Sequence, residues 1–150
     1  MRRFCLLLAI CAGFCEAGRS ESVEWFTDVR AAQAKAKEAN KLVLLDFTGS
    51  DWCVWCKRLK REVFDKPEFS QFARSRLVLV EVDFPLNKTL PEAQQQTNAG
   101  LEKTYGIRSY PTIILLDPEG KQVARIGYVF GGAAGLIAKL EKVIKKRKVP

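Results

Sequence analysis

The sequence lacks histidine entirely, and it holds only five cysteines among its 150 residues. Without histidine the chain cannot build Ser-His or Cys-His nucleophilic systems, and zinc sites that mix cysteine with histidine are excluded as well. A zinc site made of four cysteines would need two pairs of ligands. Only one pair, Cys53 and Cys56, lies beyond residue 17. We therefore expect no metal ion bound by a monomer.

Three of the cysteines lie in a segment that is typical of an export signal: Cys5, Cys11 and Cys15. Two arginines precede an apolar run from Phe4 to Phe14, and Cys15-Glu16-Ala17 fits a small-x-small cleavage site. The run is too short to span a membrane. We predict a cleaved signal peptide over residues 1–17 and a single domain over residues 18–150, in a periplasmic or secreted protein without stable membrane insertion. An uncleaved anchor or a poorly ordered N-terminus is the alternative.

Removal of that segment leaves Cys53 and Cys56 as the thiols of the chain. In an oxidising compartment an unpaired thiol is a liability, whereas a pair can cycle between dithiol and disulfide. We therefore expect this pair to carry the thiol chemistry of the protein, with no cofactor other than a redox-active disulfide.

The pattern of apolar residues predicts an α/β domain. Short, nearly all-apolar runs are typical of buried strands, and they occupy residues 42–47, 77–82 and 112–116. Helical segments are expected over residues 28–40, 56–64, 68–76, 92–105 and from about residue 133 onward. A weak first strand at residues 23–26 and a hairpin strand at residues 122–128 complete the order β-α-β-α-β-α-β-β-α.

This order places Cys53 at or just before the first turn of a helix that follows a strand. Unpaired backbone N–H groups and the positive end of the helix dipole stabilise a thiolate there, and Lys57 would add to the effect. Such placement lowers a cysteine pKa from about 8.5 into the range of roughly 3.5 to 7.5. Cys56 lies one helical turn further on, so it can form a disulfide with Cys53 or resolve a mixed disulfide with a partner.

Several separated motifs resemble those of the thioredoxin-fold thiol-disulfide oxidoreductases. They are LVLLDFTGSDWCVWCK, YGIRSYPTIILLDPEG and RIGY, within a resemblance that runs from about Val23 to Lys146. The TGSDWC-x-WC form is most similar to the exported bacterial group related to the C-terminal domain of the membrane reductase DsbD. The resemblance implies a thioredoxin fold, with a central mixed sheet of about four to five strands flanked by helices.

The resemblance also implies roles for individual residues. Cys53 would be the exposed nucleophile and Cys56 the more buried resolving thiol, while Trp52 would pack beside the pair. Pro111 matches the cis-proline of the family, and its neighbour Tyr110 would offer backbone groups to an extended substrate. An ordinary trans proline at the start of a strand is the alternative.

Asp46 lies in the apolar run LVLLDF, where burial of a charged carboxylate is unfavourable. Its pKa should therefore rise, which suits a group that exchanges a proton with Cys56 in a chain without histidine. The chain carries one more residue between this aspartate and Cys53 than is usual in the family. A role for Asp46 in capping or hydrogen-bonding the loop is therefore the alternative.

The dipeptide Val54-Trp55 separates the two cysteines and should tune the relative stability of dithiol and disulfide. Alternatively, Trp55 only covers the disulfide. The dipeptide differs from the Gly-Pro of thioredoxins and from the Pro-His or Gly-His of oxidases and isomerases. Potentials in such proteins span about −270 to −120 mV, so the direction of electron flow stays open, with reduction favoured by the likeness to DsbD.

The favoured function is an exported oxidoreductase that reduces or exchanges disulfides in partner proteins and receives electrons from an upstream thiol donor. The alternative is a non-catalytic binding module, with a permanent disulfide and a recognition surface around Tyr110. The net charge of +8 is assigned to solubility, so we expect a monomer without a nucleic-acid partner. Residues 85–98 add a loop, interpreted as a solvated connection in preference to a partner-selecting element.

Overall fold

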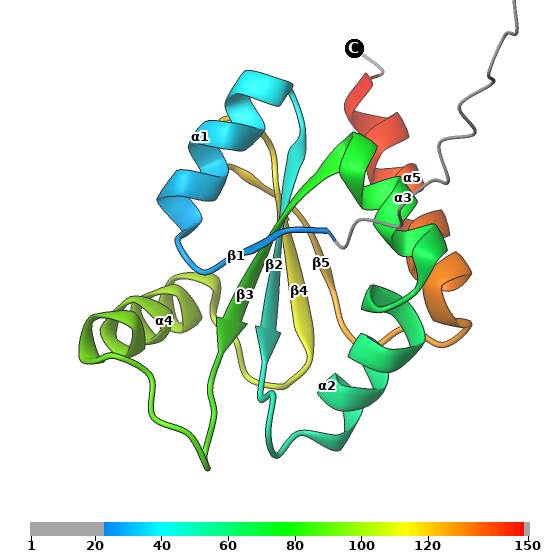
Figure 1. Ribbon diagram of the computed structural model, residues 1–150. Helices are drawn as coiled ribbons and strands as arrows, with labels where there is room; N and C mark the ends of the chain where they lie inside the picture. The colour runs from blue at the N-terminus through cyan, green and yellow to red at the C-terminus, as the bar shows by residue number, and fades with distance from the viewer. Residues whose placement is uncertain (1–22, 149–150) are drawn as a thin grey trace, which may run out of the picture.

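The computed structural model describes residues 23–148, and a five-stranded sheet forms its centre (Figure 1). The strand order is β1-β3-β2-β4-β5, with β1, β3 and β2 parallel and with β4 and β5 antiparallel to their neighbours. The strands span Trp25–Phe26 (β1), Leu42–Thr48 (β2), Leu77–Asp83 (β3), Thr112–Leu116 (β4) and Gln122–Ile126 (β5). The prediction of a mixed sheet in an α/β domain is confirmed. The signal peptide predicted over residues 1–17 lies outside the described residues.

Helices cover both faces of this sheet (Figure 1). The helices α1 and α4 pack on one face, and α2, α3 and α5 pack on the other. They span Val29–Ala39 (α1), Val54–Leu59 (α2), Pro67–Arg76 (α3), Glu92–Tyr105 (α4) and Gly132–Lys148 (α5), and a π-helical turn, η1, continues α2 over Lys60–Phe64. Within residues 23–148, none of the helices combines the length and the apolar character that a membrane span requires.

Local sequence signals account for the ends of several helices. Asp28 caps α1 by accepting hydrogen bonds from the backbone N–H groups of Arg30 and Ala31, and the left-handed backbone of Asn40 ends the helix. The two capping residues coincide with the ends of the helix predicted over residues 28–40. The helix that contains Cys56 starts at Val54 with Cys53 as its N-cap, which agrees with the prediction that Cys53 stands at or just before the first turn. The apolar pattern marks the helical run only from Cys56 onward.

The alternation of side chains along β2 directs two polar residues toward the layer of α2. Val43, Leu45 and Phe47 pack against the α1 and α4 side, whereas Leu42 and Leu44 pack against the α2, α3 and α5 side. Because successive side chains point to opposite faces of a strand, Asp46 and Thr48 share the face of Leu44. The sheet therefore presents polar groups beneath α2, where the two cysteines lie.

Candidate active site

Cys53 and Cys56 form a disulfide at the start of α2, with their Cα atoms 5.2 Å apart. The Cys53 amide donates a hydrogen bond to the carbonyl of Gly49 at 2.9 Å, and the Cys53 Sγ accepts one from the Cys56 amide at 3.2 Å. An N-cap sulfur in this position receives the field of the free amide groups, which favours a thiolate once the disulfide is reduced. This is the placement that the sequence predicts for Cys53.

In this oxidised state both cysteines are buried. Cys53 is 6% exposed and Cys56 is 4% exposed, so the disulfide shows little of the difference in exposure that the family resemblance implies. Lys57 Nζ donates a hydrogen bond to the backbone carbonyl of Asp51 at 2.6 Å. This contact fixes the turn that precedes Cys53. The exposed Val54 side chain projects from the first turn of α2.

Asp46 lies behind the disulfide, on the wall of a cavity of about 670 Å³ that Cys56 and Lys57 also line. The residue is 7% exposed, and its Oδ1 atom has no hydrogen-bond partner among the described residues. Burial, followed by the negative charges of Glu81 and Asp83, raises the pKa of Asp46 to about 8. A carboxyl group with this pKa, in the cavity that Cys56 also lines, can hold or accept a proton near neutral pH.

Trp52 packs against the entrance to the site. Its Nε1 donates a hydrogen bond to the carbonyl of Phe84 at 2.7 Å, and its ring meets the ring of Tyr110 edge-on, with 5.8 Å between centroids. The ring also lies directly over Gly49, where an added Cβ would be 2.4 Å from Trp52 Cε2. Only glycine at position 49 allows the indole ring of Trp52 to lie this close to the turn.

Trp55 lies on the other side of the motif and is 47% exposed. Its ring contacts the ring of Tyr128 with 4.9 Å between centroids, and the guanidinium of Arg58 lies 5.6 Å from the Trp55 ring. Tyr128 in turn contacts Phe130. Trp55 therefore extends an aromatic surface away from the disulfide, toward the segment that leads into α5.

The peptide bond between Tyr110 and Pro111 is cis. Pro111 is buried immediately before β4. The Tyr110 hydroxyl donates a hydrogen bond to the carboxylate of Glu102 on α4, and burial together with Glu102 raises the pKa of Tyr110. The Tyr110 side chain is therefore held in place from the α4 side.

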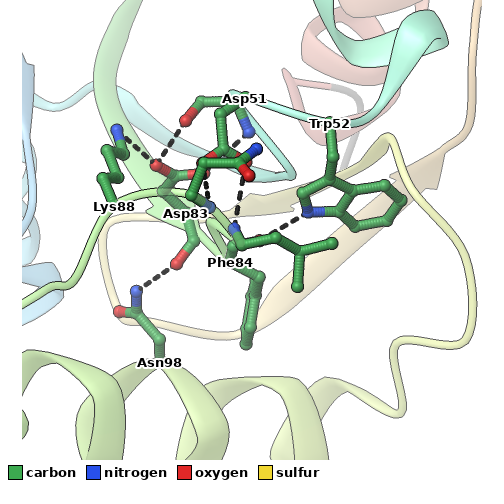
Figure 2. A network of polar contacts seen from close by, with 9 residues as sticks. Asp51, Trp52, Asp83, Phe84, Lys88 and Asn98 are labelled. Carbon is green, nitrogen blue, oxygen red and sulfur yellow. Dashed lines mark hydrogen bonds and ion pairs between the residues drawn. The ribbon is translucent and has the colours of Figure 1, made fainter.

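A polar network fastens the start of the added loop to the cysteine motif (Figure 2). The carboxylate of Asp51 accepts hydrogen bonds from the amides of Leu86 at 3.0 Å and Asn87 at 2.7 Å. These hydrogen bonds lower the pKa of Asp51, and the bond from Leu86 has the larger effect. The start of the 85–98 segment, which the sequence predicts as a solvated connection, is thus held by Asp51, two positions before Cys53.

Asp83, the last residue of β3, anchors the other half of this network (Figure 2). Its carboxylate accepts hydrogen bonds from the amide and the hydroxyl of Ser50 at 2.9 and 2.7 Å, and it pairs with Lys88 Nζ at 2.8 Å. Asn98 on α4 donates to its backbone carbonyl at 2.8 Å. The turn before Cys53, the end of β3 and α4 are therefore held together.

Sequence reasoning missed three acidic residues around the site: Asp51, Glu81 and Asp83. The signal for Glu81 was present, because it interrupts the apolar run LVLVEV as Asp46 interrupts LVLLDF. Asp51 stands in the motif DWC without a pattern that would reveal its partners. No three histidine, cysteine, aspartate or glutamate residues in the described part of the chain gather in a way that could hold a metal ion.

Comparison with known proteins agrees with this geometry. The thioredoxin-like domain family matches residues 29–144, which is most of the chain. The chain belongs to this family. Its members include thiol-disulfide oxidoreductases of the DsbH and DsbD type, so the predictions of the family and of a thioredoxin fold are confirmed.

Individual relatives place the chain within this thioredoxin-like family. The chain is 37% identical over 126 residues to the disulfide bond reductase DsbH of Chlamydia pneumoniae, covering 84% of this chain and 75% of that protein. A solved structure of a DsbH oxidoreductase superposes with a TM-score of 0.79 at 37% identity, over 83% of this chain and 86% of that one. The thiol:disulfide interchange protein DsbD of Pectobacterium atrosepticum is 31% identical over 96 residues, which cover 64% of this chain but only 15% of DsbD.

Proposed function

We propose that this thioredoxin-like protein reduces disulfides in partner proteins of an exported compartment. In the dithiol state, the thiolate of Cys53 attacks a partner disulfide, forms a mixed disulfide and releases one partner thiolate. Cys56 then attacks the Cys53 sulfur, which breaks the bond to the partner and forms the Cys53-Cys56 disulfide. Two electrons pass from the dithiol to the partner, and each released thiolate takes up a proton. An upstream thiol donor restores the dithiol.

One observation carries this proposal: the disulfide lies at the head of a helix and is surrounded by exposed apolar side chains. Within residues 23–148, the exposed large apolar residues all belong to the motif or to segments that contact it: Trp52, Val54, Trp55, Leu86 and Phe130. Exposed apolar side chains gathered around one point are typical of a surface that binds protein. A protein disulfide is therefore the substrate that fits best.

The name of one relative supports reduction as the direction of electron flow. DsbH is named a disulfide bond reductase, whereas DsbD is named a thiol:disulfide interchange protein, which supports thiol-disulfide exchange without a direction. Neither the helix start nor the dipeptide Val54-Trp55 fixes the direction, because the fold accommodates potentials over a wide range. The exported location rests on the sequence pattern of residues 1–17.

The equilibrium reduction potential of the Cys53-Cys56 pair tests this function. The protein is titrated in glutathione or dithiothreitol buffers, and a potential of roughly −270 to −220 mV supports a reductant. A potential of roughly −180 to −120 mV would instead assign the protein to the oxidases or isomerases. A potential below the reach of biological dithiols would favour a binding module with a permanent disulfide.

Substitution of the single cysteines completes the test. Cys56→Ser should accumulate a mixed disulfide with a protein substrate, because the second thiol that releases the partner is gone. Cys53→Ser, matched in chemistry and separated by one helical turn, should form none. Equal trapping by both variants would contradict the assignment of Cys53 as the nucleophile.

A further inference from the structure

The buried aspartate behind the disulfide has a second carboxyl group beside it. In the parallel register of β2 and β3, Asp46 pairs directly with Glu81. Neighbouring strands lie about 4.8 Å apart, and paired residues present their side chains on the same face. Asp46 and Glu81 both line the cavity that also contains Cys56.

Most of the other charged groups that face this cavity already have partners. Lys88, which lines the cavity from the loop after β3, pairs with Asp83 at the end of that strand. Lys60 of η1 pairs with Asp65, and Lys57 of α2 donates to a backbone carbonyl. The Oδ1 atom of Asp46, by contrast, is buried and has no hydrogen-bond partner within residues 23–148.

Two ionised carboxylates at paired positions of neighbouring strands, with Asp46 buried and Glu81 half-buried, would repel each other. Burial and the charge of Asp83 raise the pKa of Glu81, against an opposing effect of Lys88 and Lys60. Among the charged neighbours of Asp46, Glu81 raises the pKa of Asp46 the most. The lysines therefore favour one negative charge in the cavity, and the proximity of the carboxyl groups disfavours a second.

We propose that Asp46 and Glu81 form a carboxyl pair that shares one proton, and that this pair, rather than Asp46 alone, exchanges the proton of Cys56. The proposal rests on the function proposed above. Asp46 is the more deeply buried member and lines the cavity together with Cys56, and Glu81 is a positioning residue that acts through Asp46. The ionised member accepts a proton, and the cavity connects the pair to solvent.

In the resolving step, the shared proton rests on Glu81 and Asp46 is ionised. The Cys56 thiol gives its proton to Asp46, and its sulfur attacks the sulfur of Cys53. The bond between Cys53 and the partner breaks, and the electron pair of that bond leaves on the partner thiolate, which takes a proton from water. Both carboxyl groups are neutral at that moment. The pair returns to its shared-proton state by releasing one proton to water in the cavity.

Carboxyl-carbon NMR of the oxidised protein tests the pair without any turnover. In the wild type, Asp46 and Glu81 should titrate as a coupled pair, each curve showing two steps. Glu81→Gln should lower the titration midpoint of Asp46 by about one pH unit or more, because the neighbouring charge is gone. Asp46→Asn should remove the second step from the Glu81 curve, because that step reports ionisation of Asp46, and it provides a second variant should Glu81→Gln not fold.

Glu38→Gln is the matched control, since Glu38 is exposed on α1, on the opposite face of the sheet. It should leave the Asp46 midpoint where it is in the wild type. The carboxyl pair is overturned if the Asp46 midpoint in Glu81→Gln equals that in Glu38→Gln and the Glu81 curve keeps both steps in Asp46→Asn.

A kinetic measurement connects the pair to the chemistry. A mixed disulfide between Cys53 and thionitrobenzoate is formed in the reduced protein, and release of the coloured thiol is followed at different pH values. Glu81→Gln should move the pH midpoint of this release downward by about one unit, because the acceptor of the Cys56 proton is ionised at lower pH. An unchanged midpoint, with the NMR shift present, would overturn the role of the pair in proton exchange. Absence of release in the wild type would refute the proposed function alone, because the NMR titration still reports on the pair.

Discussion

Replacement of Asp46 by asparagine tests the electrostatic character of the site through the stability of the protein. The pKa of Asp46 rises from 3.8, its ordinary value, to about 8 in the fold, chiefly because the group is buried. Between these pH values the folded protein binds one proton more than the unfolded chain. Its free energy of unfolding should therefore decrease as pH rises through this interval.

The magnitude follows from the shift. At about 1.4 kcal/mol per pH unit, the interval from pKa 3.8 to about 8 gives an upper bound of about 6 kcal/mol above pH 8. Water that enters the cavity screens the charge, and we expect about half of this bound. Asparagine has no charge to bury, so the variant should escape the pH-dependent loss while it keeps the size of the side chain.

Equilibrium urea unfolding of the oxidised protein measures this effect. The stability of Asp46→Asn relative to the wild type should change little near pH 4 and then increase steadily up to about pH 8, as the wild type ionises. The exposed control Glu38→Gln should show no such trend. A difference between Asp46→Asn and the wild type that stays constant over this pH range would refute the reasoning.

Three further substitutions test the packing around the site. Gly49→Ala should destabilise the protein by about 1 to 3 kcal/mol and change the fluorescence of Trp52, because the added Cβ meets the indole ring; unchanged fluorescence would contradict that contact. Asp51→Ala should accelerate hydrogen exchange at the amides of Leu86 and Asn87, measured by NMR, and equal protection would show that the loop is held by other contacts. Leu44→Ala, in the fully buried part of β2, should lower the free energy of unfolding by about 2 to 5 kcal/mol in a denaturant titration, and a loss below that range would contradict tight packing there.

The secondary structure could be read from the sequence because local signals determine much of it. The apolar runs predicted as strands correspond to β2, β3 and β4, and the hairpin strand corresponds to β5, which ends at Ile126 rather than Tyr128. The capping residues of α1 were also visible in the sequence. The position of Cys53 at the start of α2 also agrees with the prediction, although the helical pattern itself was visible only from Cys56 onward.

The carboxyl pair of Asp46 and Glu81 could not be predicted from the sequence of either strand alone. A charged residue in an apolar run signals a special environment, and by that rule Asp46 was selected. The same rule applies to Glu81, but its meaning depends on β3 lying next to β2 in a register that pairs it with Asp46. Order along the chain leaves the strand neighbours and their register open. The partners of Asp51, more than thirty residues away, were hidden for the same reason.

The longer turn between Asp46 and Cys53 contacts both the cavity behind the disulfide and the apolar surface in front of it. The sequence raised the question of whether the extra residue displaces Asp46 from the cysteines. The structure keeps the register of β2 with β3 up to Thr48 and Asp83, and it accommodates the turn by the hydrogen bond from Cys53 to Gly49. The side chains within the turn then reach the end of β3 and the loop beyond it. The turn thus fixes both the cavity behind the disulfide and the apolar surface in front of it. A change in the turn should therefore affect proton exchange and partner binding together, whereas a change at Glu81 should affect proton exchange alone.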